Sequence, residues 1–201
     1  MEENKYMDFI PKMVDLGLPS GTLWADRNVG AEKPEDYGNH YRFGEPEPLK
    51  ATSPEYRFED SKEPFEGTDR DPATVHFNRR CHTPSIEQIK ELLKHCTQEW
   101  TSLNGVNGIR VTGPNGNSIF LPAAGSLSFS SGKAVPYAPG EFGCYWSSDP
   151  PCGFGAPINI YDGLFLAFAP EGWNYYNNYM YSGYSVRAVA KKDAFQDLFQ
   201  R

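Results

Sequence analysis

Short alternations of apolar and polar residues open the chain. Val14, Leu16 and Leu18 alternate with polar or small residues, which predicts a half-buried strand. Residues 19–21 read Pro-Ser-Gly, a turn signal, and residues 22–25 return as a second apolar run. We therefore expect a β-hairpin here.

Residues 31–72 follow a different pattern, because Pro, Glu, Asp and Gly dominate them. We expect a long irregular surface segment with a short strand near residues 41–43.

The clearest helical pattern covers residues 83–96. Thr83 suits an N-cap and Pro84 the first helical position. The apolar residues then follow helical spacing: Ile86, Ile89, Leu92, Leu93 and Cys96. We expect one helix that packs its apolar stripe on the core.

Turn signals divide the middle of the chain. Residues 109–112 and 118–122 read as short strands around the turn at 114–117, whereas residues 132–143 read as a loop. The pattern as a whole predicts an α+β fold, with short antiparallel strands, one clear helix at about 83–96 and long ordered loops.

Aromatic residues gather between residues 144 and 184. They are about twice as frequent there as in the whole chain, of which they form 14%, and the window contains no Lys or Arg. Tyr and Trp beside Ser, Gly and Asn are typical of binding loops. The alternative is a β-rich core with aromatic packing.

Two stretches of this window separate those interpretations. In residues 163–168 the period of two places Leu164, Leu166 and Phe168 on one face, expected in the core. Phe165 and Ala167 share the other face, which we expect to be exposed. Residues 174–179 show no such alternation and few aliphatic side chains, which indicates a binding surface.

Six motifs carry a resemblance to a known family. They are VDLGLPSGTLWADRNVGA (14–31), PEDYG (34–38), HTPSIEQIKELL (82–93), NGVNGIRVTGPNGNSIFLPAAG (104–125), YWSS (145–148) and GYSVRAV (183–189). In this order they resemble the Fibrobacter-succinogenes-type major paralogous domain, common in gut Bacteroidales. The resemblance implies a C-type-lectin-like domain over residues 1–190, similar to formylglycine-generating enzymes, with a variable region at about 144–189.

Some members of that family are hypervariable proteins of diversity-generating retroelements, which randomise adenines in Asn codons. Between residues 149 and 184 only Glu171, Trp173 and Met180 are residue types that such randomisation cannot produce. The resemblance implies these exposed, ligand-binding positions: Asp149, Cys152, Phe154, Ile160, Tyr161, Phe165, Ala167, Trp173, Tyr175, Tyr176, Tyr179 and Tyr184. Tyr145, Trp146, Val186 and Val189 are expected in the scaffold, and Arg187 in a structural salt bridge or backbone contact.

We therefore expect a binding domain that contacts a protein or glycan target by shape, without a cofactor or metal. The net charge of -7 argues against nucleic acid, and no apolar run is long enough for a membrane span. The N-terminus also shows no signal peptide.

The alternative to a binding domain is an enzyme of the formylglycine-generating kind, whose chemistry depends on a pair of cysteines. It would use Cys144 and Cys152, but their spacing differs from that family's motif and all four histidines precede residue 100. The adjacent pairs at 81–82 and 95–96 invite a metal interpretation, although they flank the expected helix. Calcium-dependent glycan binding would need more acidic ligands than this window supplies.

A structural or assembly role is the third class. Residues 191–201 form a tail in which Phe195, Leu198 and Phe199 share one face of a short amphipathic helix. Such a face suits docking on the domain itself, on an oligomer mate or on a carrier such as a phage particle. The localisation is otherwise unknown.

Overall fold

The computed structural model describes residues 10–50, 52–53, 56, 63–130, 133–150 and 162–192. Strands take up 40% of it and helices 10%, so the expected α+β class is wrong and the fold is sheet-rich. Helical apolar spacing is sustained only over one stretch of the described chain. Elsewhere, apolar runs bounded by Gly or Pro are no longer than the strands, which reach eight residues.

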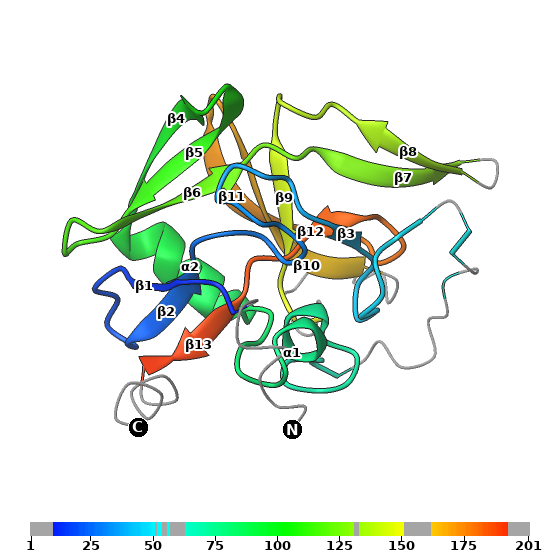
Figure 1. Cartoon of the computed structure of the whole chain (residues 1–201), viewed down its shortest axis with the longest axis horizontal. Coiled ribbons are helices and arrows are strands. Elements are labelled where there is room, and N and C mark those ends of the chain that lie inside the picture. Colours follow the sequence, from blue (N-terminus) through cyan, green and yellow to red (C-terminus); the bar gives the residue numbers. More distant parts are fainter. Residues whose placement is uncertain are drawn as a thin grey trace.

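A five-stranded sheet forms the centre of the molecule, in the order β11-β10-β9-β12-β3. Figure 1 shows it with smaller sheets around it. Its members are β3 (His40–Tyr41), β9 (Gly143–Trp146), β10 (Asp162–Ala169), β11 (Gly172–Tyr179) and β12 (Tyr184–Ser185). All neighbours pair antiparallel except β9 and β12, which are parallel.

The hairpin predicted at the start of the chain is present. β1 (Met13–Asp15) pairs with β2 (Thr22–Ala25), and β13 (Val189–Lys191) adds to the other side of β2. Segments from the two ends of the described chain therefore close one three-stranded sheet.

The middle of the chain contains more strand than we expected. β5 (Val106–Thr112) and β6 (Ser118–Pro122) form the predicted hairpin, and β4 (Thr97–Leu103) extends it to a three-stranded meander. β7 (Ser126–Ser130) pairs with β8 (Lys133–Tyr137), so part of the expected loop at 132–143 is a strand.

Two helices are described, α1 (Pro72–His76) and α2 (Ile86–His95), and neither is long and apolar enough to cross a membrane. Ser85 caps α2, in a capping box with Gln88, where we expected Thr83. Thr83 is buried, and its hydroxyl instead donates to the Asp71 carboxylate over 2.6 Å.

Apolar cores lie on both sides of the central sheet. One side packs against α2 and the β5–β6 hairpin, through residues such as Ile89 and Leu121. The other packs against α1 and the irregular segment before it, through residues such as Phe43 and Phe65. The interior strands of this sheet are therefore covered on both faces.

Arg187 has the structural role that the sequence suggests. It is buried, and its guanidinium donates to the carbonyl oxygens of Ala25 (3.0 Å) and Phe120 (2.8 Å) and to Asn28 Oδ1 (2.9 Å). These bonds tie the C-terminal segment to β2 and β6.

Candidate binding surface

The β10–β11 hairpin lies at one edge of the central sheet. Its strands pair over eight residues, from Asp162 opposite Tyr179 to Ala169 opposite Gly172. β10 also pairs with β9, whereas no described strand pairs with the outer edge of β11. β11 is thus held from one side and open to solvent on the other.

The side chains of this hairpin alternate between two faces. On the side of α2, which we call the helix face, Tyr175 lies opposite Leu166 and packs partly against the core. The Lys90 ammonium lies 5.5 Å from the centre of the Tyr175 ring. Tyr176 lies opposite Phe165 on the other face, which we call the groove face, so Tyr175 and Tyr176 point in opposite directions.

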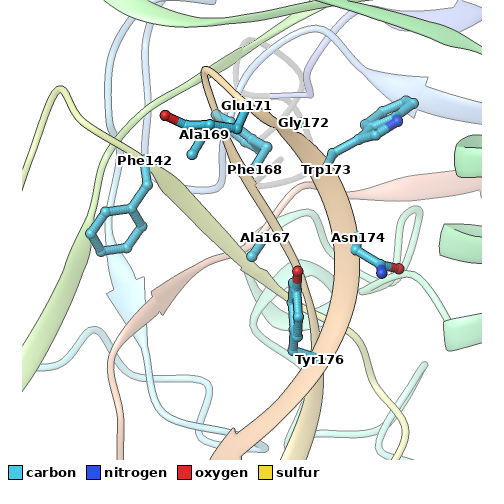
Figure 2. Close-up of a pocket in the computed structure, with 9 residues that line it drawn as sticks. All are labelled: Phe142, Ala167, Phe168, Ala169, Glu171, Gly172, Trp173, Asn174 and Tyr176. Atoms are coloured by element: carbon cyan, nitrogen blue, oxygen red, sulfur yellow. The ribbon is translucent and has the colours of Figure 1, made fainter.

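An open groove of about 460 Å³ lies against the turn end of the hairpin. Figure 2 shows Ala167 at its centre, with the rings of Phe142 and Tyr176 on either side and Glu171 at one end. The remaining lining residues are Phe168, Ala169, Gly172, Trp173 and Asn174. Because Ala167 is small, the space between the two rings stays open.

A second aromatic feature marks the far end of β11. The rings of Tyr179 and Tyr181 stack with centres 5.1 Å apart and planes 10° from parallel. Both are exposed, at 44% and 40%. Stacking against each other restricts their rotamers while an outer ring surface stays accessible.

Two asparagine side chains accept hydrogen bonds from backbone N–H groups of β11. The backbone N–H and carbonyl of Leu164 bond to residues 149 and 147, so they point toward the β9 side of β10. Those of the next residue, Phe165, point the opposite way, toward β11, where they pair with the backbone of Tyr176. The N–H groups of Tyr175 and Tyr179 therefore point to the outer edge. Each donates to the side-chain oxygen of the preceding asparagine, Asn174 or Asn178, over 2.8 Å.

The structure divides the predicted ligand-binding residues. Tyr176 and Tyr179 are exposed, and Ala167, Trp173 and Tyr175 are half-buried. Ala167, Trp173 and Tyr176 meet at the groove. Cys152, Phe154, Ile160 and Tyr161 lie outside the described residues.

The expected exposure of Phe165 is wrong, and Tyr184 is buried too. Their ring centres lie 4.7 Å apart, and the Trp146 ring lies 4.3 Å from Tyr184. Burial raises the pKa of Tyr184 to about 12. Both faces of β10 are covered by a core. The alternation places Phe165 and Leu166 on opposite faces of the strand, but neither face is exposed to solvent.

Asp149 has a structural contact rather than a free carboxylate. Its Oδ2 accepts a hydrogen bond from the backbone N–H of Ile86 over 2.6 Å, at the first turn of α2. Partial burial raises the pKa of Asp149. The side chain therefore helps to join α2 to the chain after β9.

Sequence reasoning missed Phe142, Glu171, Asn174 and Tyr181. Phe142 lies in a stretch expected to be a loop outside the aromatic window, and only the fold brings it to the hairpin. Glu171 lies in the turn between β10 and β11, and the position of that turn could have indicated it.

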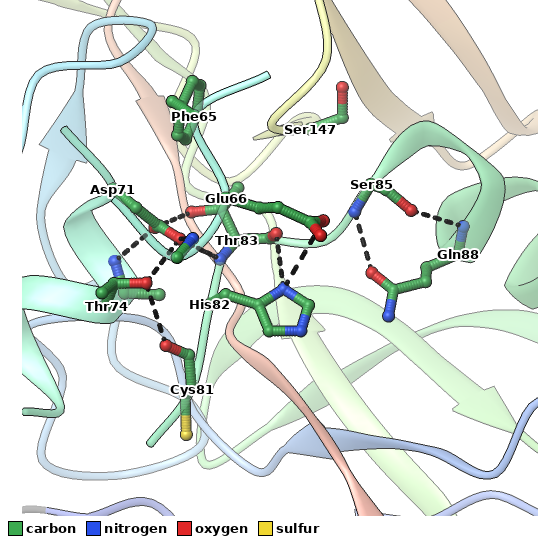
Figure 3. Close-up of polar contacts among 12 residues, drawn as sticks. Phe65, Glu66, Asp71, Thr74, Cys81, His82, Thr83, Ser85, Gln88 and Ser147 are labelled. Atoms are coloured by element: carbon green, nitrogen blue, oxygen red, sulfur yellow. Dashed lines mark hydrogen bonds and ion pairs between the residues drawn. The ribbon is translucent and has the colours of Figure 1, made fainter. Parts of the chain in front are cut away.

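A buried polar cluster lies away from the hairpin, around Asp71 (Figure 3). The Asp71 carboxylate accepts from Thr83 N–H and hydroxyl, from the Thr74 hydroxyl, and from Gly67 and Ala73 N–H. With so many donors, this carboxylate holds the segment before α2 in place and has no free position for a substrate.

The thiols described do not fit a nucleophile. Burial raises the pKa of Cys81 and of Cys144 to about 12, and that of Cys96 to about 11, so all three are protonated near neutral pH. Cys144 lies within β9 with its side chain buried. Within the described ranges, no three His, Cys, Asp or Glu side chains gather as metal ligands.

Comparisons with known proteins add no assignment. No family model, no curated protein and no solved structure matches the chain. The family resemblance suggested by the motifs thus stays a prediction, and the functional argument depends on the geometry of the hairpin.

Proposed function

We propose that this chain is a binding module whose β10–β11 hairpin contacts a protein or glycan target without catalysing a reaction. One observation carries the proposal. Tyr176 and Tyr179 are 53% and 44% exposed on an edge strand, although the neighbouring strand is buried on both faces. Large aromatic side chains thus face solvent from a rigid support.

Rigid presentation matters because binding must offset the entropy lost on association. A Tyr side chain has only two χ angles and a large contact area, so it loses little freedom when it is covered. Few residues usually supply most of the binding energy at an interface, and Tyr is frequent among them. Tyr176 beside the groove and the Tyr179–Tyr181 stack fit this role.

The family resemblance supports the same proposal. Variable members of the suggested family change residues in the segment that contains this hairpin, which is expected of a surface that meets changing targets. Attachment to a carrier through Phe195, Leu198 and Phe199 belongs to the proposal too, although these residues lie outside the described chain.

The experiment compares the wild-type chain with a Tyr176→Ala/Tyr179→Ala double variant. Both are screened on a glycan array and against displayed surface proteins, and reproducible binders are measured by biolayer interferometry. We expect binding to weaken at least tenfold, the equivalent of about 1.4 kcal/mol. Tyr175 is left unchanged because it packs on the core.

Val75→Ala is the matched control, since Val75 is a 48% exposed apolar residue on α1 and does not line the groove. We expect it to keep binding, and all variants to keep their melting temperature within a few degrees. The proposal is wrong if the folded double variant binds every reproducible target with wild-type affinity.

A further inference from the structure

The groove combines two aromatic rings with a carboxylate. Phe142 and Tyr176 stand on either side of Ala167, and Glu171 lies at one end (Figure 2). Faces of aromatic rings carry partial negative charge, which attracts cations, and Lys and Arg side chains bind there. A carboxylate at the end of such a space adds a charged acceptor.

Among the residues that the structure describes, no basic side chain lines this groove. Glu171 is the only charged residue among the lining residues that belong to the described part of the chain. Glu141, also exposed, directly precedes Phe142 in the chain. Between residues 142 and 190 the sequence contains one basic residue, Arg187, which is buried and bonded inside the fold.

Lys90 lies on the other side of the hairpin. Its ammonium approaches Tyr175, whose side chain belongs to the helix face, and it forms an ion pair with Glu87. The groove face therefore keeps its negative potential, and the chain as a whole carries a net charge of -7.

We propose that the groove receives a lysine or arginine side chain of a protein partner. Its aliphatic stem lies over Ala167 between the two rings, and its charged end meets Glu171. This inference rests on the proposed function, because it names the chemistry of the target that the hairpin contacts. A neutral glycan could stack on the rings but would gain nothing from the carboxylate.

Small probes test the charge directly. Nα-acetyl-lysine methylamide and Nα-acetyl-arginine methylamide are titrated into protein with ¹³C-labelled alanine methyl groups. The norleucine and citrulline analogues are the neutral controls, and methyl β-glucoside represents a glycan. We expect the Ala167 methyl signal to move with the two cations only, and less at high salt.

Variants assign the interaction to the groove. We expect Glu171→Gln and Tyr176→Ala each to weaken the cationic probes about two- to fivefold, as exposed ion pairs and cation–π contacts do. Glu87→Gln removes the same charge from α2, on the other side of the hairpin, and should leave the titration unchanged.

Three results overturn the inference. The neutral analogues could shift Ala167 as strongly as the cations, methyl β-glucoside could be the only probe that shifts it, or no probe could shift it. In each case the proposed function stands if Tyr176→Ala/Tyr179→Ala still weakens target binding at least tenfold. If that double variant binds targets normally while the cations shift Ala167, the proposed function fails and the cation site remains.

Discussion

Strands β10 and β11 lie side by side over eight residue pairs, and both are rich in aromatic residues, yet their surroundings differ completely. β10 has a strand on each edge and a core on each face, so Phe165 and Leu166 are both buried although they point to opposite faces. β11 has a strand on one edge only, and Tyr176, directly opposite Phe165, is largely exposed. Whether aromatic residues are buried or exposed therefore depends on the position of their strand in the sheet more than on its aromatic content.

The composition of the two strands records this difference. Residues 163–168 read Gly-Leu-Phe-Leu-Ala-Phe, with no polar side chain on either face. Such a continuous apolar run is typical of a strand buried on both faces. Residues 174–179 contain three asparagines among three tyrosines, which suits an edge strand whose polar atoms meet solvent.

Replacing Phe165 with alanine tests the buried side of the comparison most strongly. We expect Phe165→Ala to lower the free energy of unfolding by about 3–5 kcal/mol, because it leaves a cavity beside Trp146 and Tyr184. Tyr176→Ala, at the paired position, should lower it by no more than about 1 kcal/mol, the usual contribution of a cross-strand aromatic pair. Urea denaturation followed by tryptophan fluorescence measures both, and equal losses would contradict the comparison.

Much of the local structure could be predicted from the sequence. Turn residues and apolar periods located the hairpins at β1–β2 and β5–β6, and a helix lies inside the range expected for one. β4 could not be recognised, because its sequence, TQEWTSL, has the polar composition of a loop. It forms a strand through its pairing with β5. The fold class was wrong because the number of strands depends on such pairing, which the composition of a single segment does not show.

The candidate site was predicted less well. The aromatic window pointed to β11, and Tyr176 and Tyr179 are exposed there. Alternation alone could not show that a second core covers Phe165, since that core is built from residues as distant as Phe43 and Phe65. Phe142 reaches the groove through the fold and carries no local signal.

At the other edge of the same sheet, a buried histidine is expected to make the stability of the fold depend on pH. His40 lies in β3 with its Nε2 buried, and burial lowers its pKa below 6.5 despite the opposing effect of the backbone at Ala124 and Gly125. As pH falls through 6.5 the unfolded chain gains a proton that the folded chain does not, so stability decreases with acidification. Each unit of pKa depression costs about 1.4 kcal/mol once both forms are protonated.

We therefore expect the melting temperature to fall between pH 7.5 and pH 5.5, and to fall less in His40→Asn. Burial also lowers the pKa of His76, so some of the decrease remains. Comparing wild type and variant at each pH isolates His40 from other groups. His95→Asn is the control because His95 is exposed, and an identical pH slope in wild type and His40→Asn would exclude this role.

The hydroxyl of Tyr184 connects the buried side of the comparison to the exposed strand. Asn178 Nδ2 donates to it over 2.6 Å. Tyr184→Phe keeps the ring in the core and removes this acceptor, so we expect a loss of about 0.5–1.5 kcal/mol. Chemical denaturation measures the loss, and Tyr137→Phe, on an exposed tyrosine, should cost nothing. A Tyr184→Phe variant as stable as wild type would show that the bond adds nothing to folding.

The smallest effect on stability concerns the open edge of β11. Asn174 and Asn178 cover the outward N–H groups of Tyr175 and Tyr179, and exposed strand edges with free donors are templates for pairing with another chain. We expect Asn174→Ala, which frees the Tyr175 N–H and keeps the bond between Asn178 and Tyr184, to change folding by less than about 0.5 kcal/mol but to promote self-association, seen by light scattering as concentration rises. Asn177→Ala, whose amide donates to Asp162 instead, is the matched control and should stay like wild type. If Asn174→Ala does not associate more than this control, the Asn174 side chain does not protect the edge of β11 from pairing with another chain.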